Sequence, residues 1–239
     1  MIDRVYRIRS YHGGLGDELQ FSTFPELFTA CGYEVHLLKD SNEVLPFRNF
    51  GIKQFVWGRN PYIKAESSGD WRLGDKPGLV YKNTENDFIK NWEKMFGLEP
   101  QNSLPKIYYS PKLIKGVEGL IDTSALSLKY NSERVIEIVQ FLVRTSGMNF
   151  KQIVSDHQAN NIDIPGMEKI RFRGLYEAYD ALCSCNEFIS LSSGLHSVAA
   201  AASRQNQNMV HHCILPDSDY AWTMETKKFV YPGIKYIKE

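Results

Sequence analysis

The sequence has no excess of charge of one sign, no long apolar run and few cysteines. Lys plus Arg total 28 and Asp plus Glu total 28, so the formal net charge is zero. A neutral chain disfavours general binding along a nucleic-acid backbone, although a local basic patch would still allow it. No run approaches the ~18 apolar residues of a membrane span, and the charged first ten residues lack the apolar core of a secretory signal. We therefore expect neither a transmembrane segment nor a leader.

The cysteines, without a secretory context, are expected to be free thiols in a reducing compartment, which favours the cytoplasm. The four are Cys31, Cys183, Cys185 and Cys213. The last three suggest a zinc set together with His211 and His212. The C-x-C spacing on a helix, however, points its two thiols about 200° apart, which disfavours shared ligation, so buried free cysteines are the favoured interpretation.

What the sequence does contain is the composition of an ordinary globular protein. Its 239 residues are 43% hydrophobic, 13% aromatic and 23% charged. That length fits one large domain or two small domains of roughly 110 residues each. Neither an internal repeat nor a low-complexity tract is present.

The first 38 residues have the pattern of a βαβ unit. Residues 4–10 predict a strand, a glycine-rich turn follows, and apolar residues three and four apart predict a helix from Leu19 to Cys31. Pro25 would kink or break that helix, and Gly32 is placed to end it. Residues 33–38 predict a second strand, parallel to the first.

The middle of the chain is less regular. Residues 53–57 (KQFVW) predict a short strand, and residues 58–82 predict mostly loop. An amphipathic pattern predicts a helix over 84–96. Residues 99–112 contain three prolines and are the best candidate for a linker. We therefore divide the chain into two domains, 1–110 and 111–239.

The second half alternates strands and helices. Strands are predicted over 118–122, 150–155, 168–172 and 187–191, and helices over 132–145, 175–185 and 195–203. Asn131 or Ser132 is expected to cap the first of these helices and Gly147 to end it. The chain as a whole predicts an α/β fold of two Rossmann-like domains facing a cleft, where open sheets of this kind bind ligands.

The first candidate site loop is HGGLGDEL, residues 12–19. Gly14 and Gly16 let the backbone approach a ligand closely, and the N–H groups of the following helix start favour an anion. Asp17 either caps that helix or points into the cleft as a general base. The loop lacks the third glycine of the dinucleotide fingerprint and the Lys-Ser/Thr pair of a P-loop.

The second candidate site loop is SSGLHSVAA, residues 192–200, which follows a strand and opens a helix of small residues. Hydroxyls and free N–H groups at such a helix start form a ready diphosphate site. The alternative is a plain strand–turn–helix in which the serines only cap the helix.

Together the two loops resemble the ADP-heptose lipopolysaccharide heptosyltransferase-like family, which has the GT-B glycosyltransferase fold. Gly16-Asp17-Glu18-Leu19 matches the family's G-D-x-L loop. The second loop matches the family's D-S-G-x-x-H-x-A-A segment at Ser193, Gly194, Ala199 and Ala200. It departs at Ser192, where Asp is usual, and at His196, which stands one place earlier than the family's His. Lys129 and Glu133 match weakly a lysine-containing turn before a helix, and the chain is short for the family.

The resemblance implies a sugar transferase that uses a nucleotide-sugar donor without a cofactor or a metal. By the family's motifs, Asp17 would activate the acceptor hydroxyl and Lys129 would neutralise phosphate charge. The donor diphosphate would lie against Ser193, Gly194, His196 and Ser197. The implied partners are a nucleotide-sugar donor, bound by domain 111–239, and a glycan or other hydroxyl acceptor, on the side of domain 1–110.

Two other interpretations remain open. A non-catalytic protein on a degenerate transferase fold would bind a nucleotide or a glycan, and a transferase acting on modified nucleic-acid bases would bind DNA or RNA. For several further residues, a functional role competes with a purely structural one: a turn, a solvent-exposed strand face or loop packing. These are Asp217 and Asp219 as a metal-binding D-x-D string, Arg171 and Arg173 as phosphate contacts, and Trp57, Asn60, Pro61 and Tyr62 as sugar- or base-stacking residues.

Overall fold

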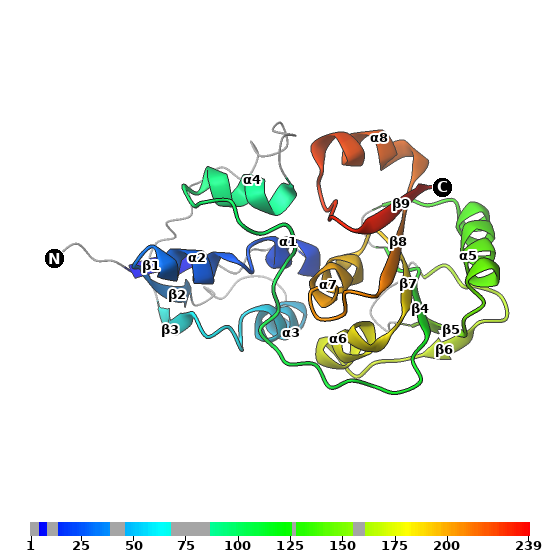
Figure 1. The fold of residues 1–239 in the computed structure, drawn as a ribbon, viewed down its shortest axis with the longest axis horizontal. Helices are drawn as coiled ribbons and strands as arrows, with labels where there is room; N and C mark the ends of the chain where they lie inside the picture. Colours follow the sequence, from blue (N-terminus) through cyan, green and yellow to red (C-terminus); the bar gives the residue numbers. More distant parts are fainter. Residues whose placement is uncertain (1–4, 9–13, 39–45, 68–86, 126–127, 155–160) are drawn as a thin grey trace.

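The chain folds around two parallel β-sheets, one in each half (Figure 1). The computed structural model describes residues 5–8, 14–38, 46–67, 87–125, 128–154 and 161–239. The first sheet has the order β1-β2-β3, with β1 at Val5–Ile8, β2 at Glu34–Leu38 and β3 at Ile63–Ser67. The second has the order β6-β5-β4-β7-β8-β9. Its strands are β4 (Gly119–Asp122), β5 (Phe150–Ile153), β6 (Glu168–Ile170), β7 (Glu187–Leu191), β8 (Val210–Leu215) and β9 (Ile234–Lys238).

Eight helices of the described residues connect and cover these strands (Figure 1). In the first half they are α1 (Leu15–Gln20), α2 (Phe24–Ala30), α3 (Pro46–Val56) and α4 (Phe88–Met95). In the second half they are α5 (Ser132–Ser146), α6 (Leu175–Ser184), α7 (Gly194–Ala202) and α8 (Asp217–Thr226). The side chain of Asn131 caps α5 and Gly147 ends it in the left-handed conformation, as predicted.

The helix predicted from Leu19 to Cys31 is two helices. A turn over residues 21–23 separates α1 from α2, and α1 starts four residues earlier than predicted. Pro25 stands in the first turn of α2, where its missing N–H leaves no helical hydrogen bond unmade. The proline therefore marks the start of a new helix.

The strand predicted over 53–57 is wrong, because these residues lie at the end of α3 and beyond it. Ile52, Phe55 and Val56 are buried at helical spacing, a pattern that the five-residue run hides. Residues 58–82 were predicted to be mostly loop, but β3 falls within them; residues 68–82 lie outside the described part of the chain. Asp217 opens α8 and does not lie in a turn.

One hydrophobic core serves both halves. Its buried residues include Ile8 and Leu19 from the first half and Leu120, Phe188 and Val198 from the second. The packing of α1 against α7 and of α3 against α6 joins the halves. The proposed boundary at residue 110 therefore separates the two sheets but divides this shared core, and the division into domains stays a proposal.

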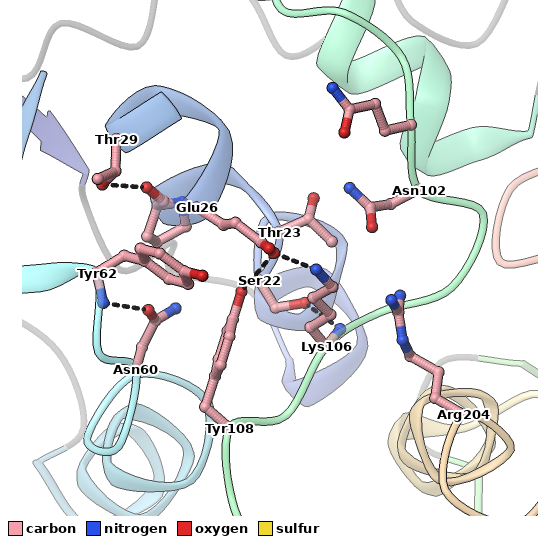
Figure 2. A network of polar contacts seen from close by, with 12 residues as sticks. Ser22, Thr23, Glu26, Thr29, Asn60, Tyr62, Asn102, Lys106, Tyr108 and Arg204 are labelled. Atoms are coloured by element: carbon pink, nitrogen blue, oxygen red, sulfur yellow. Dashed lines mark hydrogen bonds and ion pairs between the residues drawn. The ribbon is translucent and has the colours of Figure 1, made fainter. Parts of the chain in front are cut away.

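The chain passes between the halves as an extended crossing segment, residues 98–118, which contains neither helix nor strand (Figure 1). Figure 2 shows one anchor of this segment on α2: the Lys106 ammonium pairs with the Glu26 carboxylate, to which the Tyr108 hydroxyl also donates at 3.1 Å. Partial burial alone would raise the pKa of Glu26, but the hydrogen bond and charge of Lys106 and the Tyr108 hydroxyl hold it below its usual value. The backbone N–H of Lys106 donates to Ser22 Oγ at 2.9 Å.

A second anchor is the carboxylate of Glu93 on α4, which is fully buried. Its two oxygens accept hydrogen bonds from Thr23 Oγ1 at 2.9 Å and from the Gln101 N–H at 2.7 Å. They also accept the Asn102 N–H at 3.1 Å and Asn102 Nδ2 at 2.8 Å. Glu93 thus ties the crossing segment to α4 and to the turn between α1 and α2.

Candidate functional site

The second sheet has its switch point between β4 and β7. From β4 the strand order runs to β5 and β6 on one side and to β7, β8 and β9 on the other. In open parallel sheets, ligands bind at the carboxyl ends of the strands where the order reverses. The loop after β7, which the sequence predicted as a diphosphate site, lies at this place.

Ser193 caps α7 at this switch point. Its Oγ accepts the backbone N–H of His196 at 3.4 Å, which is the contact of an N-cap residue. The same hydroxyl donates to Oδ2 of Asp122, the last residue of β4, at 2.7 Å. The first backbone N–H groups of a helix have no partner within it, so the start of α7 presents donors next to Ser193.

Asp122 is a buried partner of the Ser193 loop that the sequence did not predict. Its side chain is only 1% exposed, and Oδ1 accepts the Ser124 hydroxyl and, at 3.1 Å, the Ser124 N–H. Burial raises the pKa of Asp122, and the hydrogen bonds from Ser124 and Ser193 oppose that shift. The available signal was a carboxylate that ends a buried strand just before a loop of small residues.

Asp17 lies in the first turn of α1, where its Oδ2 accepts the N–H of the N-cap residue Gly14 at 2.9 Å. This is the capping contact that the sequence analysis weighed against a general base. No described residue donates a hydrogen bond to Oδ1. The neighbouring acid, Glu18, is buried and accepts the indole N–H of Trp57 at 2.8 Å, so its role is to hold α3 against α1.

The two predicted loops come together where α1 packs on α7. A Cβ added to Gly16 would lie 3.1 Å from Ser197 Oγ and 3.3 Å from a ring carbon of Phe229. A Cβ added to Gly194 would lie 3.1 Å from the Cβ of Leu15. Both glycines therefore permit a close approach of two helix starts from opposite halves of the chain.

Ser197 faces this helix contact. It is 1% exposed, and its Oγ accepts the Tyr231 hydroxyl at 2.9 Å. Gln20 of α1 donates in turn to the Tyr231 oxygen, and its Nε2 also lies 3.1 Å from the Gly16 carbonyl. Ser197 thus joins α1, α7 and the segment after α8 through buried hydrogen bonds.

The ring of His196 lies in the core beneath the loop. Its Nε2 donates to the Phe229 carbonyl at 2.9 Å, and its Nδ1 lies 3.3 Å from His211 Nε2. Burial lowers the pKa of His196 to about 4, although the Phe229 contact acts in the opposite direction. Burial also lowers the pKa of His211 well below its usual value. Both imidazoles are neutral near pH 7, and it is the backbone N–H of His196 that reaches Ser193.

This buried pair predicts that the protein loses stability as the pH falls below 6.5. His196 titrates near 6.5 when unfolded and at about 4 when folded, so between these values the unfolded chain binds more protons. The linkage gives about 1.4 kcal/mol per pH unit, or about 3 kcal/mol for His196 at pH 4, with His211 acting in the same direction. Urea unfolding at several pH values measures the slope. A His196→Gln variant with an unchanged slope would contradict the assignment.

Lys129 is exposed in the loop between β4 and α5. The next residue, Tyr130, accepts the Ser192 N–H with its hydroxyl at 3.0 Å and donates to the Ile214 carbonyl at 3.3 Å. Lys129 is thus the immediate sequence neighbour of a residue whose side chain contacts the second loop. This places the cation on the same edge of the sheet as the start of α7.

The other candidates fall into structural settings. Asp217 pairs with Lys238, and the Ser218 hydroxyl donates to Asp219 at 2.7 Å. Among the residues that the structure describes, no group of three or more His, Cys, Asp or Glu side chains could hold a metal ion. All four cysteines are free. His212 instead lies 3.2 Å from Glu187.

The aromatic and arginine candidates make structural contacts of their own. Trp57 is buried and donates its indole N–H to Glu18. Asn60 is also buried, and its side-chain oxygen accepts the Tyr62 N–H at 3.1 Å. Pro61 is exposed. Arg171 and Arg173 are exposed just beyond the end of β6, and the Arg173 N–H donates to Glu177 at 2.6 Å.

Three solved glycosyltransferase structures have a similar arrangement of elements. The iron-containing dodecameric glycosyltransferase TibC from enterotoxigenic E. coli H10407 matches with a TM-score of 0.63 and 17% identity, over 98% of this chain and 62% of that chain. A glycosyl transferase family 9 protein from Veillonella parvula DSM 2008 matches with a TM-score of 0.60 and 9% identity, over 98% and 86%. E. coli heptosyltransferase WaaC, solved with ADP-2-deoxy-2-fluoro heptose, matches with a TM-score of 0.57 and 11% identity, over 98% and 92%.

These matches concern structure, because no model of a protein family and no curated protein sequence matches the chain. The chain spans only about three fifths of TibC, at 62% of its length. The TibC structure is that of an iron-containing enzyme. No described helix is long and apolar enough to cross a bilayer.

The matches to the three solved structures show that the chain has the GT-B-type α/β fold of these transferases, as the resemblance of its two loops implied.

Proposed function

We propose that the protein is a glycosyltransferase that moves a sugar from a nucleotide-sugar donor to an acceptor hydroxyl. The observation that carries the proposal is the contact between α1 and α7. It brings Asp17 from the first half and the Ser193 loop from the second half to neighbouring helix starts. The shared fold with three transferases supports the reaction class.

In this proposal the donor diphosphate binds at the start of α7. The backbone N–H groups of Gly194 and Leu195 and the hydroxyl of Ser193 face the phosphate oxygens, and the helix dipole favours their negative charge. His196 contributes through its backbone, and Ser197 holds α7 against α1. Gly14 and Gly16 contribute backbone at the start of α1.

The reaction breaks the bond between the sugar carbon and the diphosphate and forms a bond from that carbon to the acceptor oxygen. Asp17 takes the acceptor proton on Oδ1 while Oδ2 keeps its hydrogen bond to Gly14. Negative charge grows on the departing diphosphate. Lys129 and the start of α7 stabilise that charge, so we propose a reaction that needs no metal.

A cytoplasmic location fits this proposal, because the four cysteines are free and a nucleotide sugar is the expected substrate. The non-catalytic alternative is favoured by one observation: Asp17 and Ser193 both make capping contacts that would stabilise the helices without any reaction. The alternative of a nucleic-acid acceptor gains no specific support.

A thermal-shift panel tests the donor site. Wild-type protein is heated with ADP-, UDP-, GDP- and CDP-sugars and with the free nucleotides, with and without EDTA. A ligand at about 100 times its dissociation constant stabilises the fold by about 2.7 kcal/mol. We expect a shift with one nucleotide family that EDTA leaves unchanged. No shift with any nucleotide would contradict the donor site, and a shift abolished by EDTA would contradict metal independence.

A further inference from the structure

The contact between Asp122 and Ser193 links the end of β4 to the start of α7, two elements separated by 71 residues. Asp122 is buried, and its carboxyl group accepts hydrogen bonds from Ser193 Oγ, Ser124 Oγ and the Ser124 N–H. Within the described parts of the chain, no ion pair forms with Asp122. A buried carboxyl group held only by neutral donors is unusual, because burial penalises its charge.

The direction of the Ser193 hydroxyl depends on the protonation of Asp122. An ionised carboxylate only accepts hydrogen bonds, so the single hydroxyl hydrogen of Ser193 is then committed to Asp122. One lone pair of the serine oxygen accepts the His196 N–H, and the other then faces a ligand and repels an anion. A protonated Asp122 can instead donate its own hydrogen to Ser193 Oγ, which frees the serine hydrogen for a ligand oxygen.

We propose that Asp122 is a positioning residue for the donor diphosphate: it takes up a proton when the diphosphate binds, and so turns the Ser193 hydroxyl hydrogen toward a phosphate oxygen. This inference rests on the proposed function, since it concerns the same binding site. The proton comes from solvent and stays on the carboxyl group, and no covalent bond of the protein or the ligand changes. A second anion near Asp122 favours that proton further.

The groups around Asp122 support this coupling. On β8, two strands away, burial keeps Cys213 as a neutral thiol by raising its pKa, and burial keeps His211 neutral by lowering its pKa. On α7, His196 is neutral for the same reason. Lys129, in the loop that follows β4, is exposed to solvent. No buried cation among these groups holds Asp122 in its ionised form.

The test compares wild type with Asp122→Asn by isothermal titration calorimetry from about pH 6 to about pH 8. The probes are ADP-glucose and UDP-glucose, because their esterified diphosphate keeps a constant charge over this range. We expect wild-type affinity to rise about tenfold toward the lower pH, with proton uptake that depends on the buffer. The side-chain amide of the Asp122→Asn variant always carries a hydrogen to donate, so this variant should bind with the higher affinity at every pH and take up no proton.

Four further variants separate positioning from a structural role. Ser193→Ala should bind weakly at every pH, and adding Asp122→Asn to it should change nothing more. Ser124→Ala removes a hydrogen bond that favours the ionised form of Asp122, so the midpoint of the pH dependence should move upward. Asp180→Asn is the matched control. Asp180 accepts the Tyr109 hydroxyl at 3.1 Å from a place on α6, and this substitution should leave the pH dependence unchanged.

The outcomes distinguish this inference from the proposed function. If wild type binds the probes and Asp122→Asn keeps the same pH dependence, Asp122 does not position Ser193, while the donor site stands. Equal affinity losses at every pH in Asp122→Asn and Ser124→Ala would likewise overturn the inference and leave only a structural role. If neither probe binds wild type, and the thermal-shift panel also shows no ligand, the proposed function fails and the inference fails with it.

Discussion

Replacing Asp17 by Asn should lower the rate of sugar transfer by about 10²- to 10⁴-fold, the usual contribution of a general base. Asparagine has nearly the same shape but does not accept a proton from the acceptor hydroxyl. The donor should still bind, because its proposed contacts are with α7, with Lys129 and with the backbone of Gly14 and Gly16, all of which the substitution leaves in place. The measurement is kcat and KM with the donor found in the thermal-shift panel and a set of saccharide acceptors.

This substitution leaves the fold intact, which makes the result interpretable. The amide oxygen of the introduced asparagine can still accept the Gly14 N–H, so the cap of α1 is kept. Glu137→Gln is the matched control, because Glu137 is an exposed acid on α5 that lies in neither candidate loop. It should keep full activity. An Asp17→Asn enzyme with wild-type kcat would contradict the assignment of the base.

Replacing Glu93 by Ala should lower the free energy of unfolding by about 3–5 kcal/mol, the cost of several unsatisfied buried donors, which corresponds to a fall in Tm of about 10 °C for a chain of this size. The variant removes both carboxylate oxygens and leaves the buried Asn102 amides and Thr23 hydroxyl without their acceptor. Unsatisfied buried donors are costly because water does not replace the lost partner. Urea unfolding and thermal unfolding both measure the loss.

The matched control is Glu137→Ala on α5. The Glu137 side chain is 66% exposed and pairs with Arg134 at 2.8 Å, so its loss should change stability by less than about 1 kcal/mol. Glu93→Gln tests the geometry more finely, since one oxygen becomes a donor that faces other donors. Glu93→Ala and Glu137→Ala proteins of equal stability would show that Glu93 does not anchor the crossing segment.

The sequence predicted the second half better than the first. Helix α5 has strong periodicity over fifteen residues together with a capping Asn131 and a terminal Gly147, so its position follows from local signals. Strand and helix are harder to distinguish in a run as short as 53–57, because so few residues fit either period. The helix there becomes visible only when Ile52 is included with Phe55 and Val56.

The candidate site was predicted in part. Local sequence identified the two glycine-containing loops, and the fold brings them together at Gly16 and Gly194. The partner of Ser193 was missed, because Asp122 lies 71 residues away and meets the serine only through the order of the strands in the sheet. Sequence spacing also does not reveal that the ring of His196 turns into the core, since that depends on His211 from β8.

The central claim is that a donor diphosphate binds at the start of α7, and amide hydrogen exchange with and without nucleotide tests it most directly. With the ligand from the thermal-shift panel, we expect slower exchange in peptides that contain Gly194 and Leu195. The alternative location is a hollow of about 250 Å³ elsewhere on the molecule. It is lined by residues that include Lys106, Tyr108 and Arg204. Protection around that hollow, with unchanged exchange at the start of α7, would contradict the account.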